Sequence, residues 1–137
     1  MLTPQKNREI VFQFLYSADF TSSEIGELFP FFMEHHQVSK KNLFTAQEQA
    51  KEISHRLVEI DQLIQGTAKE YEFERIPKVE RNILRLGVYE LRFSKDLPQK
   101  VAISEAVRLA RKFATAESAN FVNAILDAIF KERLSEL

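Results

Sequence analysis

The sequence predicts an all-α fold, and three observations support that class. Only 3 Gly and 4 Pro occur among 137 residues, so the chain has few of the residues that form the tight turns of β-hairpins. Apolar side chains recur at steps of three and four residues along most of the chain, which is the period of an amphipathic helix. Hydrophobic residues make up 45% of the chain, enough for the core of one domain. We therefore expect a single all-α domain of about six helices over residues 1–137.

The first two predicted helices have identifiable starts. Thr3 can cap the first helix, with Pro4 in the first turn, where a missing N–H costs nothing. The second helix is expected to follow a capping box formed by Thr21 and Glu24. Pro30 should kink or shorten this helix, because proline removes a backbone donor and clashes with the preceding turn.

The third predicted helix has the most regular spacing. Its apolar residues follow alternating steps of three and four, and Gly66 is placed to end it in a left-handed conformation. Such a stripe is typical of a coiled coil or of a long core helix, and the short, Phe-rich chain favours a core helix in a bundle. The stripe consists of Leu43, Ala46, Ala50, Ile53, Leu57, Ile60 and Ile64.

Three further helices complete the prediction. Residues 67–76 form a connection, and Pro77 can start the fourth helix. A polar turn over residues 94–98 separates the fourth helix from the fifth, and Ser118 is a candidate cap for the last one. No stretch has the pattern of a β-strand or of an internal repeat.

Residues able to carry catalysis are scarce. The chain has no Cys, which excludes disulfides, thiolate zinc sites, iron–sulfur clusters and cysteine nucleophiles. Glu52 and His55 have the Glu-x-x-His spacing of di-iron bundles, but the sequence lacks a second copy and two further carboxylates. His35 and His36 would point about 100° apart on a helix, and no third ligand accompanies them. We therefore expect no catalytic residue, no metal site and no enzyme activity.

The sequence also bears on location. No apolar run approaches the roughly 18 residues needed to span a bilayer. No basic segment followed by an apolar one opens the chain. We expect a cytoplasmic protein with no membrane partner.

Charge is unevenly distributed along the chain. The net charge of −1 conceals +1 over residues 1–16, −6 over residues 17–74, +6 over residues 75–112 and −2 over residues 113–137. This asymmetry suits a polyanion or a charged protein partner. It equally suits two oppositely charged surfaces that stabilise each other within one fold.

Basic side chains also recur at helical spacing, so several share one helix face. Phosphate recognition needs donors close together in this way, but a solvated charged face has the same pattern. The sequence pattern by itself supports both interpretations. The residues are Lys78, Arg81 and Arg85 in the fourth predicted helix, Arg108, Arg111 and Lys112 in the fifth, and Lys6 and Arg8 near the N-terminus.

Four stretches together resemble one protein family. They are residues 8–16 (REIVFQFLY), 79–91 (VERNILRLGVYEL), 101–107 (VAISEAV) and 121–127 (FVNAILD), and Ile60-Asp61-x-x-Ile64 also matches. In this order and spacing they are similar to the NusB family of transcription antitermination factors. The similarity runs from residue 4 to about residue 130.

The resemblance implies a fold of two three-helix bundles and a bacterial protein without catalytic activity or a cofactor. It further implies binding to the boxA segment of nascent, single-stranded RNA. NusB-family proteins act there with NusE, the antitermination name of a small-subunit ribosomal protein. The complex with RNA polymerase reads through terminators, chiefly in ribosomal RNA operons.

The resemblance also implies functional residues. Tyr16 and Glu80 match positions of the protein-partner surface, although Glu80 could equally be a first-turn residue favoured by the helix dipole. Phe121 could stack on an unpaired base, whereas the helical period slightly favours a core position for it. The positions that match RNA contacts are Lys6, Arg8, Ser118, Asn120 and Phe121.

One departure from the family pattern concerns RNA affinity. Many relatives carry three or four arginines near the start, whereas this chain has Gln5, Lys6, Asn7 and Arg8. With fewer phosphate contacts, RNA binding should be weaker and less sensitive to salt.

Three alternatives accompany this prediction. The protein could be a scaffold that holds NusE but has lost RNA recognition, or a homodimer that hides its RNA surface. Similar helical domains also precede RNA methyltransferase domains. Because the sequence ends at Leu137 without a cofactor-binding fold, we expect no methyl transfer.

Overall fold

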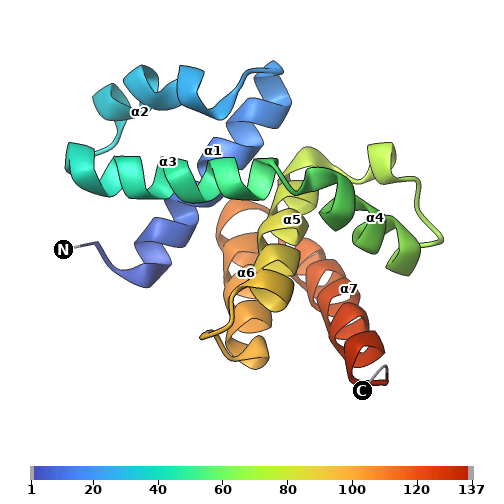
Figure 1. The fold of residues 1–137 in the computed structure, drawn as a ribbon. Helices are drawn as coiled ribbons and strands as arrows, with labels where there is room; N and C mark the ends of the chain where they lie inside the picture. Colours follow the sequence, from blue (N-terminus) through green and yellow to red (C-terminus); the bar gives the residue numbers. More distant parts are fainter. Residues whose placement is uncertain (1, 136–137) are drawn as a thin grey trace. The chain divides into compact units, whose positions relative to one another are not determined.

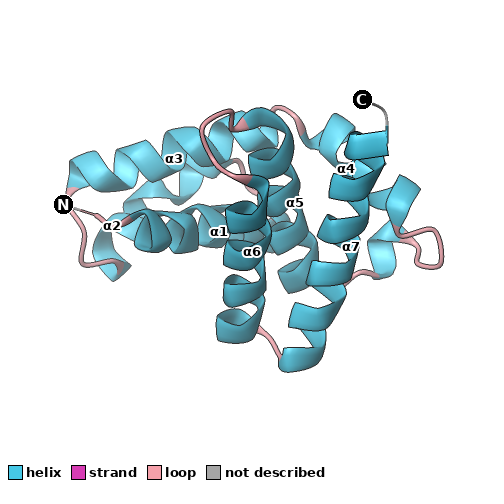
Figure 2. Ribbon diagram, turned by 90° about the horizontal axis from the view of Figure 1, so that it is seen from below, coloured by secondary structure: helices cyan, strands magenta, loops and turns pink. Residues whose placement is uncertain are grey.

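The computed structural model describes residues 2–135, and within that range the chain forms seven α-helices and two short 3-10 helices, with no strand (Figure 1, Figure 2). The predicted all-α class is confirmed. The chain divides into two compact units, the first ending at Arg56 and the second beginning at Leu57. Unit 1 contains α1, α2 and α3, and unit 2 contains α4 to α7. The two expected groups of helices are therefore present, but the second has one helix more than predicted.

Helix α1 (Pro4–Thr21) begins as the sequence predicts. The Thr3 side chain accepts a hydrogen bond from the backbone N–H of Lys6 at 3.1 Å, which fixes the first turn. The helix ends at Thr21, and the C-cap residue Ser22 has a left-handed φ of 56°. Helix α1 packs mainly on α3 (Lys40–Ser54) within unit 1.

The capping box predicted at Thr21 and Glu24 is wrong, because α1 continues through Thr21. Glu24 instead forms a capping box with Glu27 at the start of a 3-10 helix, η1 (Ile25–Leu28). Pro30 then lies in the first turn of α2 (Phe29–His35), where its missing N–H is tolerated. The predicted shortening at Pro30 is confirmed, since the expected second helix is divided into η1 and α2.

The long third helix of the prediction is two helices, α3 and α4 (Leu57–Thr67). The break falls at His55 and Arg56, where the N–H of Arg56 bonds to the carbonyl of Ile53 in a tighter turn. Residues of the apolar stripe up to Ile53 are buried within unit 1, and Ile60 is buried within unit 2. One regular stripe thus serves two cores, and periodicity alone does not reveal where it is divided.

Gly66 does not end a helix in the left-handed conformation, which corrects the prediction. It lies within α4, and none of the glycines has a positive φ. Helix α4 continues to Thr67 without a left-handed cap, and the 3-10 helix η2 (Phe73–Arg75) follows.

Helix α5 (Lys78–Phe93) is the central element of unit 2. It contacts α4, α6 (Gln99–Phe113) and α7 (Ala116–Ser135), and every residue from Arg81 to Val88 is buried. A Cβ on Gly87 would meet Cδ1 of Leu126 at 2.7 Å, so α5 and α7 approach closely where α5 has no side chain. The charged residues inside this buried run therefore need partners within unit 2.

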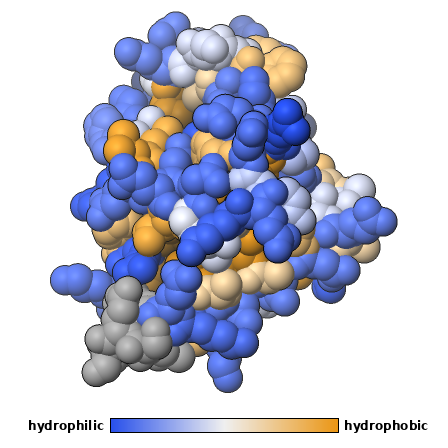
Figure 3. Space-filling view, turned by 90° about the vertical axis from the view of Figure 1, so that its right-hand side faces the viewer, coloured by the Kyte–Doolittle hydropathy of each residue, from blue (hydrophilic) through white to orange (hydrophobic). Residues whose placement is uncertain are grey.

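One face of the molecule can be followed in Figure 3. Hydrophilic side chains cover most of the face shown in Figure 3, with small apolar areas between them. No helix within residues 2–135 combines the length and the apolar character that crossing a membrane requires.

Candidate nucleic-acid interface

The first turn of α1 presents the basic residues that the family resemblance assigns to RNA. Lys6 is exposed and Arg8 is half-buried. Between them, Nδ2 of Asn7 donates a hydrogen bond to Oε1 of Gln49 on α3 at 2.6 Å. With the Thr3 cap, this bond holds the turn against the body of unit 1, so the Lys6 ammonium extends from a fixed base.

The start of α7 differs from the prediction. Ser118 is not the cap, because α7 begins at Ala116 and the hydroxyl oxygen of Thr115 accepts a hydrogen bond from the Ser118 N–H at 3.0 Å. The two hydroxyl oxygens are also 3.0 Å apart. Both residue types cap helices well, and the sequence offers no means of choosing between neighbouring candidates. Ser118 therefore lies in the first turn.

A cavity of about 280 Å³ opens beside the start of α7. The half-buried ring of Phe121 meets the exposed ring of Tyr71 edge-on, with centroids 5.3 Å apart. The core position that periodicity favoured for Phe121 is therefore not what the structure has. Asn120 is exposed on the same turn. The lining is formed by Tyr71, Arg75, Ile76, Pro77, Glu80, Thr115, Glu117, Ser118 and Phe121.

Tyr71 and Arg75 are among the residues of this cavity that sequence reasoning missed. Both lie in the connection between α4 and α5, to which the sequence analysis assigned no function. Oε1 of Gln65 accepts a bond from the Phe73 N–H at 2.7 Å, and Nε2 donates to the Tyr71 carbonyl at 2.8 Å. The linker is thus fastened to α4. No local motif in the sequence predicts that contact.

The cavity also joins residues that the resemblance assigns to different partners. The hydroxyl of Ser118, an expected RNA contact, donates a hydrogen bond to Oε1 of Glu80, an expected partner contact, at 3.0 Å. Glu80 lies in the first turn of α5, where the helix dipole also favours its charge. One hydrogen bond therefore links a residue predicted to contact RNA with a residue predicted to contact the protein partner.

Tyr16, the other expected partner contact, belongs to an aromatic row on α1. Its ring lies 6.0 Å from Phe12 and 5.9 Å from Phe20, centroid to centroid. Phe12 is buried, Tyr16 is half-buried and Phe20 is 64% exposed. The row therefore leads from the core of unit 1 to its surface.

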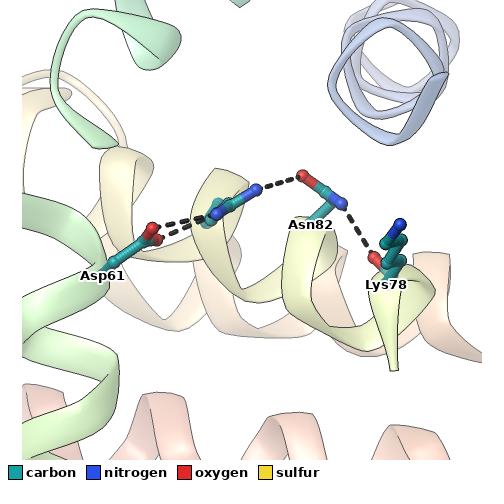
Figure 4. A network of polar contacts seen from close by, with 4 residues as sticks. Asp61, Lys78 and Asn82 are labelled. Carbon is teal, nitrogen blue, oxygen red and sulfur yellow. Dashed lines mark hydrogen bonds and ion pairs between the residues drawn. The ribbon is translucent and has the colours of Figure 1, made fainter. Parts of the chain in front are cut away.

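Two of the basic residues grouped by helical spacing, Arg81 and Arg85, are interior residues. Each is 8% exposed, and their guanidinium carbons lie 5.2 and 5.3 Å from the centre of the Phe73 ring. Nε and Nη2 of Arg85 donate to the two carboxylate oxygens of Asp61, both at 2.9 Å, and Nη1 donates to Oδ1 of Asn82 (Figure 4). Both interpretations offered by the sequence, a phosphate-binding face and a solvated face, are therefore wrong for Arg81 and Arg85.

The other members of the basic groups differ in their surroundings. Arg108 pairs with Glu105 on the same helix at 3.3 Å. Lys78, Arg111 and Lys112 are exposed, as either a solvated face or a phosphate-binding face requires.

Metal ligation finds no support in the described residues. Within residues 2–135, no three His, Asp or Glu side chains come together as a metal site would need. His35 stacks on Phe31, with ring centroids 4.1 Å apart, and His36 is half-buried beside Phe32. Burial lowers the pKa of His36, and the nearby charges of Lys6 and His35 lower it further.

The architecture places the protein among small all-α proteins built from two helical units. The model of the NusB family matches residues 5–131, nearly the whole chain, and the chain belongs to the NusB family. A transcription antitermination protein NusB from Chlamydia pneumoniae is 37% identical to it over 128 residues, which cover 93% of this chain and 80% of the relative.

Solved structures agree with this assignment. A NusB from T. maritima superimposes with a TM-score of 0.81 at 34% identity, over the full length of both chains. A crystal structure of antitermination factors NusB and NusE in complex with double-stranded RNA matches with a TM-score of 0.81 at 32% identity, covering 93% of this chain and 96% of the other. The predicted family and fold are thus confirmed.

Proposed function

We propose that this protein is a transcription antitermination factor that binds boxA-type single-stranded RNA together with NusE, as a single functional domain over residues 1–137. In this role it joins the RNA polymerase antitermination complex in the cytoplasm, and it carries out no catalysis. Family membership over residues 5–131 carries the proposal, because it extends across both units. The similar complex of NusB, NusE and RNA supports both partners.

Two surfaces support the RNA contact. In unit 1, the Lys6 ammonium stands exposed on a capped first turn, beside the half-buried Arg8. In unit 2, the Phe121 and Tyr71 rings border a cavity that has room for a base, with Asn120 exposed next to it. Proteins that recognise single-stranded RNA combine cations for the phosphates with aromatic rings for unstacked bases.

The partner surface is supported by the row of rings on α1 and by Glu80. Aromatic residues are enriched in protein interfaces, and the 64% exposed Phe20 beside Tyr16 offers apolar area to a partner. Glu80 is half-buried and adds a carboxylate that can pair with a basic residue of NusE.

The test is fluorescence anisotropy of a labelled boxA-type RNA titrated with this protein, with and without NusE, at two salt concentrations. We expect salt-sensitive binding that tightens with NusE and discriminates against a scrambled RNA. A third arm uses the same RNA annealed to its complement, because the related complex contains a duplex. Tighter binding to the duplex would contradict the single-stranded assignment.

The scaffold alternative predicts a different outcome. If NusE binds while the boxA-type and scrambled RNAs remain indistinguishable, the protein holds its ribosomal partner without reading RNA. Light scattering of the free protein distinguishes a homodimer that hides the RNA surface from a monomer.

A further inference from the structure

The end of α2 carries a preformed pair of rings that neither proposed surface uses. Phe31 is 57% exposed, and the His35 ring stacks on it with centroids 4.1 Å apart and planes 23° apart. Nδ1–H of His35 donates to the Phe31 carbonyl oxygen at 2.9 Å, which fixes the imidazole over the phenyl ring. The pair is therefore held in place before any ligand arrives.

Basic residues follow this pair along the chain. His36 follows directly, and Lys40 and Lys41, both exposed, open α3 four and five residues later. Glu34 is the one acidic residue between residues 29 and 41. The end of α2 and the start of α3 therefore offer two ammonium groups and two imidazoles against a single carboxylate.

The expected RNA contact on α1 adjoins this group. The charge of Lys6 is near enough to His36 to help lower the pKa of that imidazole, after the larger effect of burial. All of these residues belong to unit 1. The expected RNA contact at Lys6 and the ring pair thus belong to the same unit, with His36 between them in charge range of Lys6.

We propose that the Phe31–His35 ring pair, with Lys40 and Lys41 at the start of the next helix, is a second RNA subsite that stacks a base flanking the boxA segment. This inference rests on the proposed RNA function and extends it. Stacking on aromatic rings tolerates any base, so the subsite adds affinity for single-stranded RNA without adding sequence preference. The added affinity also compensates for the small number of basic residues near the N-terminus.

The direct test uses the absence of Trp from this chain. The variant Phe31→Trp places a single indole in the ring pair, and stacking on a base quenches its emission. Two boxA-type RNAs are compared with the unextended RNA, one carrying about six extra adenylates at its 5′ end and one carrying them at its 3′ end. We expect one extension to quench the indole and the unextended RNA to leave it bright.

The matched control is Phe20→Trp, and both Trp variants are titrated without NusE because Phe20 lies on the proposed partner surface. Phe20 is an equally exposed phenylalanine of the same unit, at the opposite end of α1 from Lys6. Its emission should not respond to either extension. Quenching of both variants by the same RNA would indicate unspecific association and would overturn the proposal.

Affinity gives a second readout. In the unsubstituted protein, the effective extension should tighten binding about 5- to 100-fold, the range of one stacked base. The double variant Phe31→Ala with His35→Ala should lose that gain and keep the affinity for unextended RNA. Both side chains are exposed, and circular dichroism verifies that the variant is folded.

The outcomes separate this inference from the proposed function. If unextended boxA-type RNA binds and neither extension adds affinity, the subsite is refuted while the proposed function stands. If no RNA binds even with NusE present, both are refuted. A dimer that Phe31→Ala dissociates in light scattering would assign the ring pair to a second copy of this chain and overturn the RNA subsite.

Discussion

The hydroxyl of Ser118 donates a 3.0 Å hydrogen bond to the carboxylate of Glu80, joining the first turn of α7 to the first turn of α5. Ser118 is an expected RNA contact and Glu80 an expected protein contact, and both line the same cavity. A ligand that reorients either side chain changes the hydrogen bonding of the other. This bond gives a physical route by which NusE and RNA could influence each other's affinity.

Glu80→Gln tests this link. Removing one negative charge from the cavity should tighten RNA binding by the protein alone about 2- to 5-fold at low salt, because phosphate is no longer repelled. NusE should bind more weakly, and its enhancement of RNA affinity should shrink. Anisotropy measured with and without NusE gives both quantities. Glu52→Gln, an exposed change on α3, is the control and should leave both unchanged.

Lys6→Glu should weaken RNA binding about tenfold at low salt and reduce the slope of log affinity against log salt by about one. The exposed side chain carries little of the fold, so the urea midpoint should stay within error. Lys95→Glu makes the same charge change in the turn between α5 and α6 and should leave affinity unchanged. Equal losses in the two variants would mean that net charge alone governs binding.

The sequence was sufficient for the fold class, because apolar periodicity and scarce turn residues are local signals. It was insufficient at the junction of α3 and α4, where one stripe from Leu43 to Ile64 is divided between two cores. The sequence also misplaced the cap of α7 at Ser118, because Thr115, three residues earlier, is another good capping residue.

The candidate site could be predicted only in part from the sequence. The family pattern located Lys6, Phe121 and Glu80, whereas Tyr71 became part of the cavity through contacts that no local motif encodes. Helical spacing correctly grouped Arg81 and Arg85 on one face. It does not indicate that Asp61 and Phe73 cover that face.

Replacing either of two arginines on α5 by methionine should change the free energy of unfolding differently. Arg85→Met leaves the Asp61 carboxylate and the Asn82 carbonyl without their donor, and should cost about 2–3 kcal/mol of unfolding free energy. Arg92 lines a different cavity, and among the described residues its buried Nε has no hydrogen-bond partner. Arg92→Met should be neutral or stabilise by up to about 1 kcal/mol. Urea titrations of both variants test the contrast, and equal losses would contradict it.

The acid sensitivity of the fold should depend on His36. Because its pKa in the folded protein is lowered, chiefly by burial, the unfolded chain takes up a proton at a higher pH than the folded one. The contribution of His36 to the stability of the folded protein is therefore present above about pH 6.5. It is lost as the pH falls through the pKa of His36 in the folded protein. His36→Gln should show a smaller fall in urea midpoint between pH 8 and pH 5 than the parent, and the exposed His55→Gln should match the parent. An unchanged fall in the His36 variant would place the acid sensitivity in other groups.

Two glycines in helices should also respond oppositely to alanine. Gly66→Ala adds a methyl group into open space near the end of α4, and should stabilise the protein by about 0.5 kcal/mol through its better helix propensity. Gly87→Ala brings the same methyl group to 2.7 Å from Cδ1 of the fully buried Leu126, which has to shift within a packed core. The overpacking should outweigh the propensity gain and leave a net loss of about 1–2 kcal/mol. Thermal and urea unfolding of the two variants measure the difference, and a gain in both would mean that Leu126 rearranges at little cost.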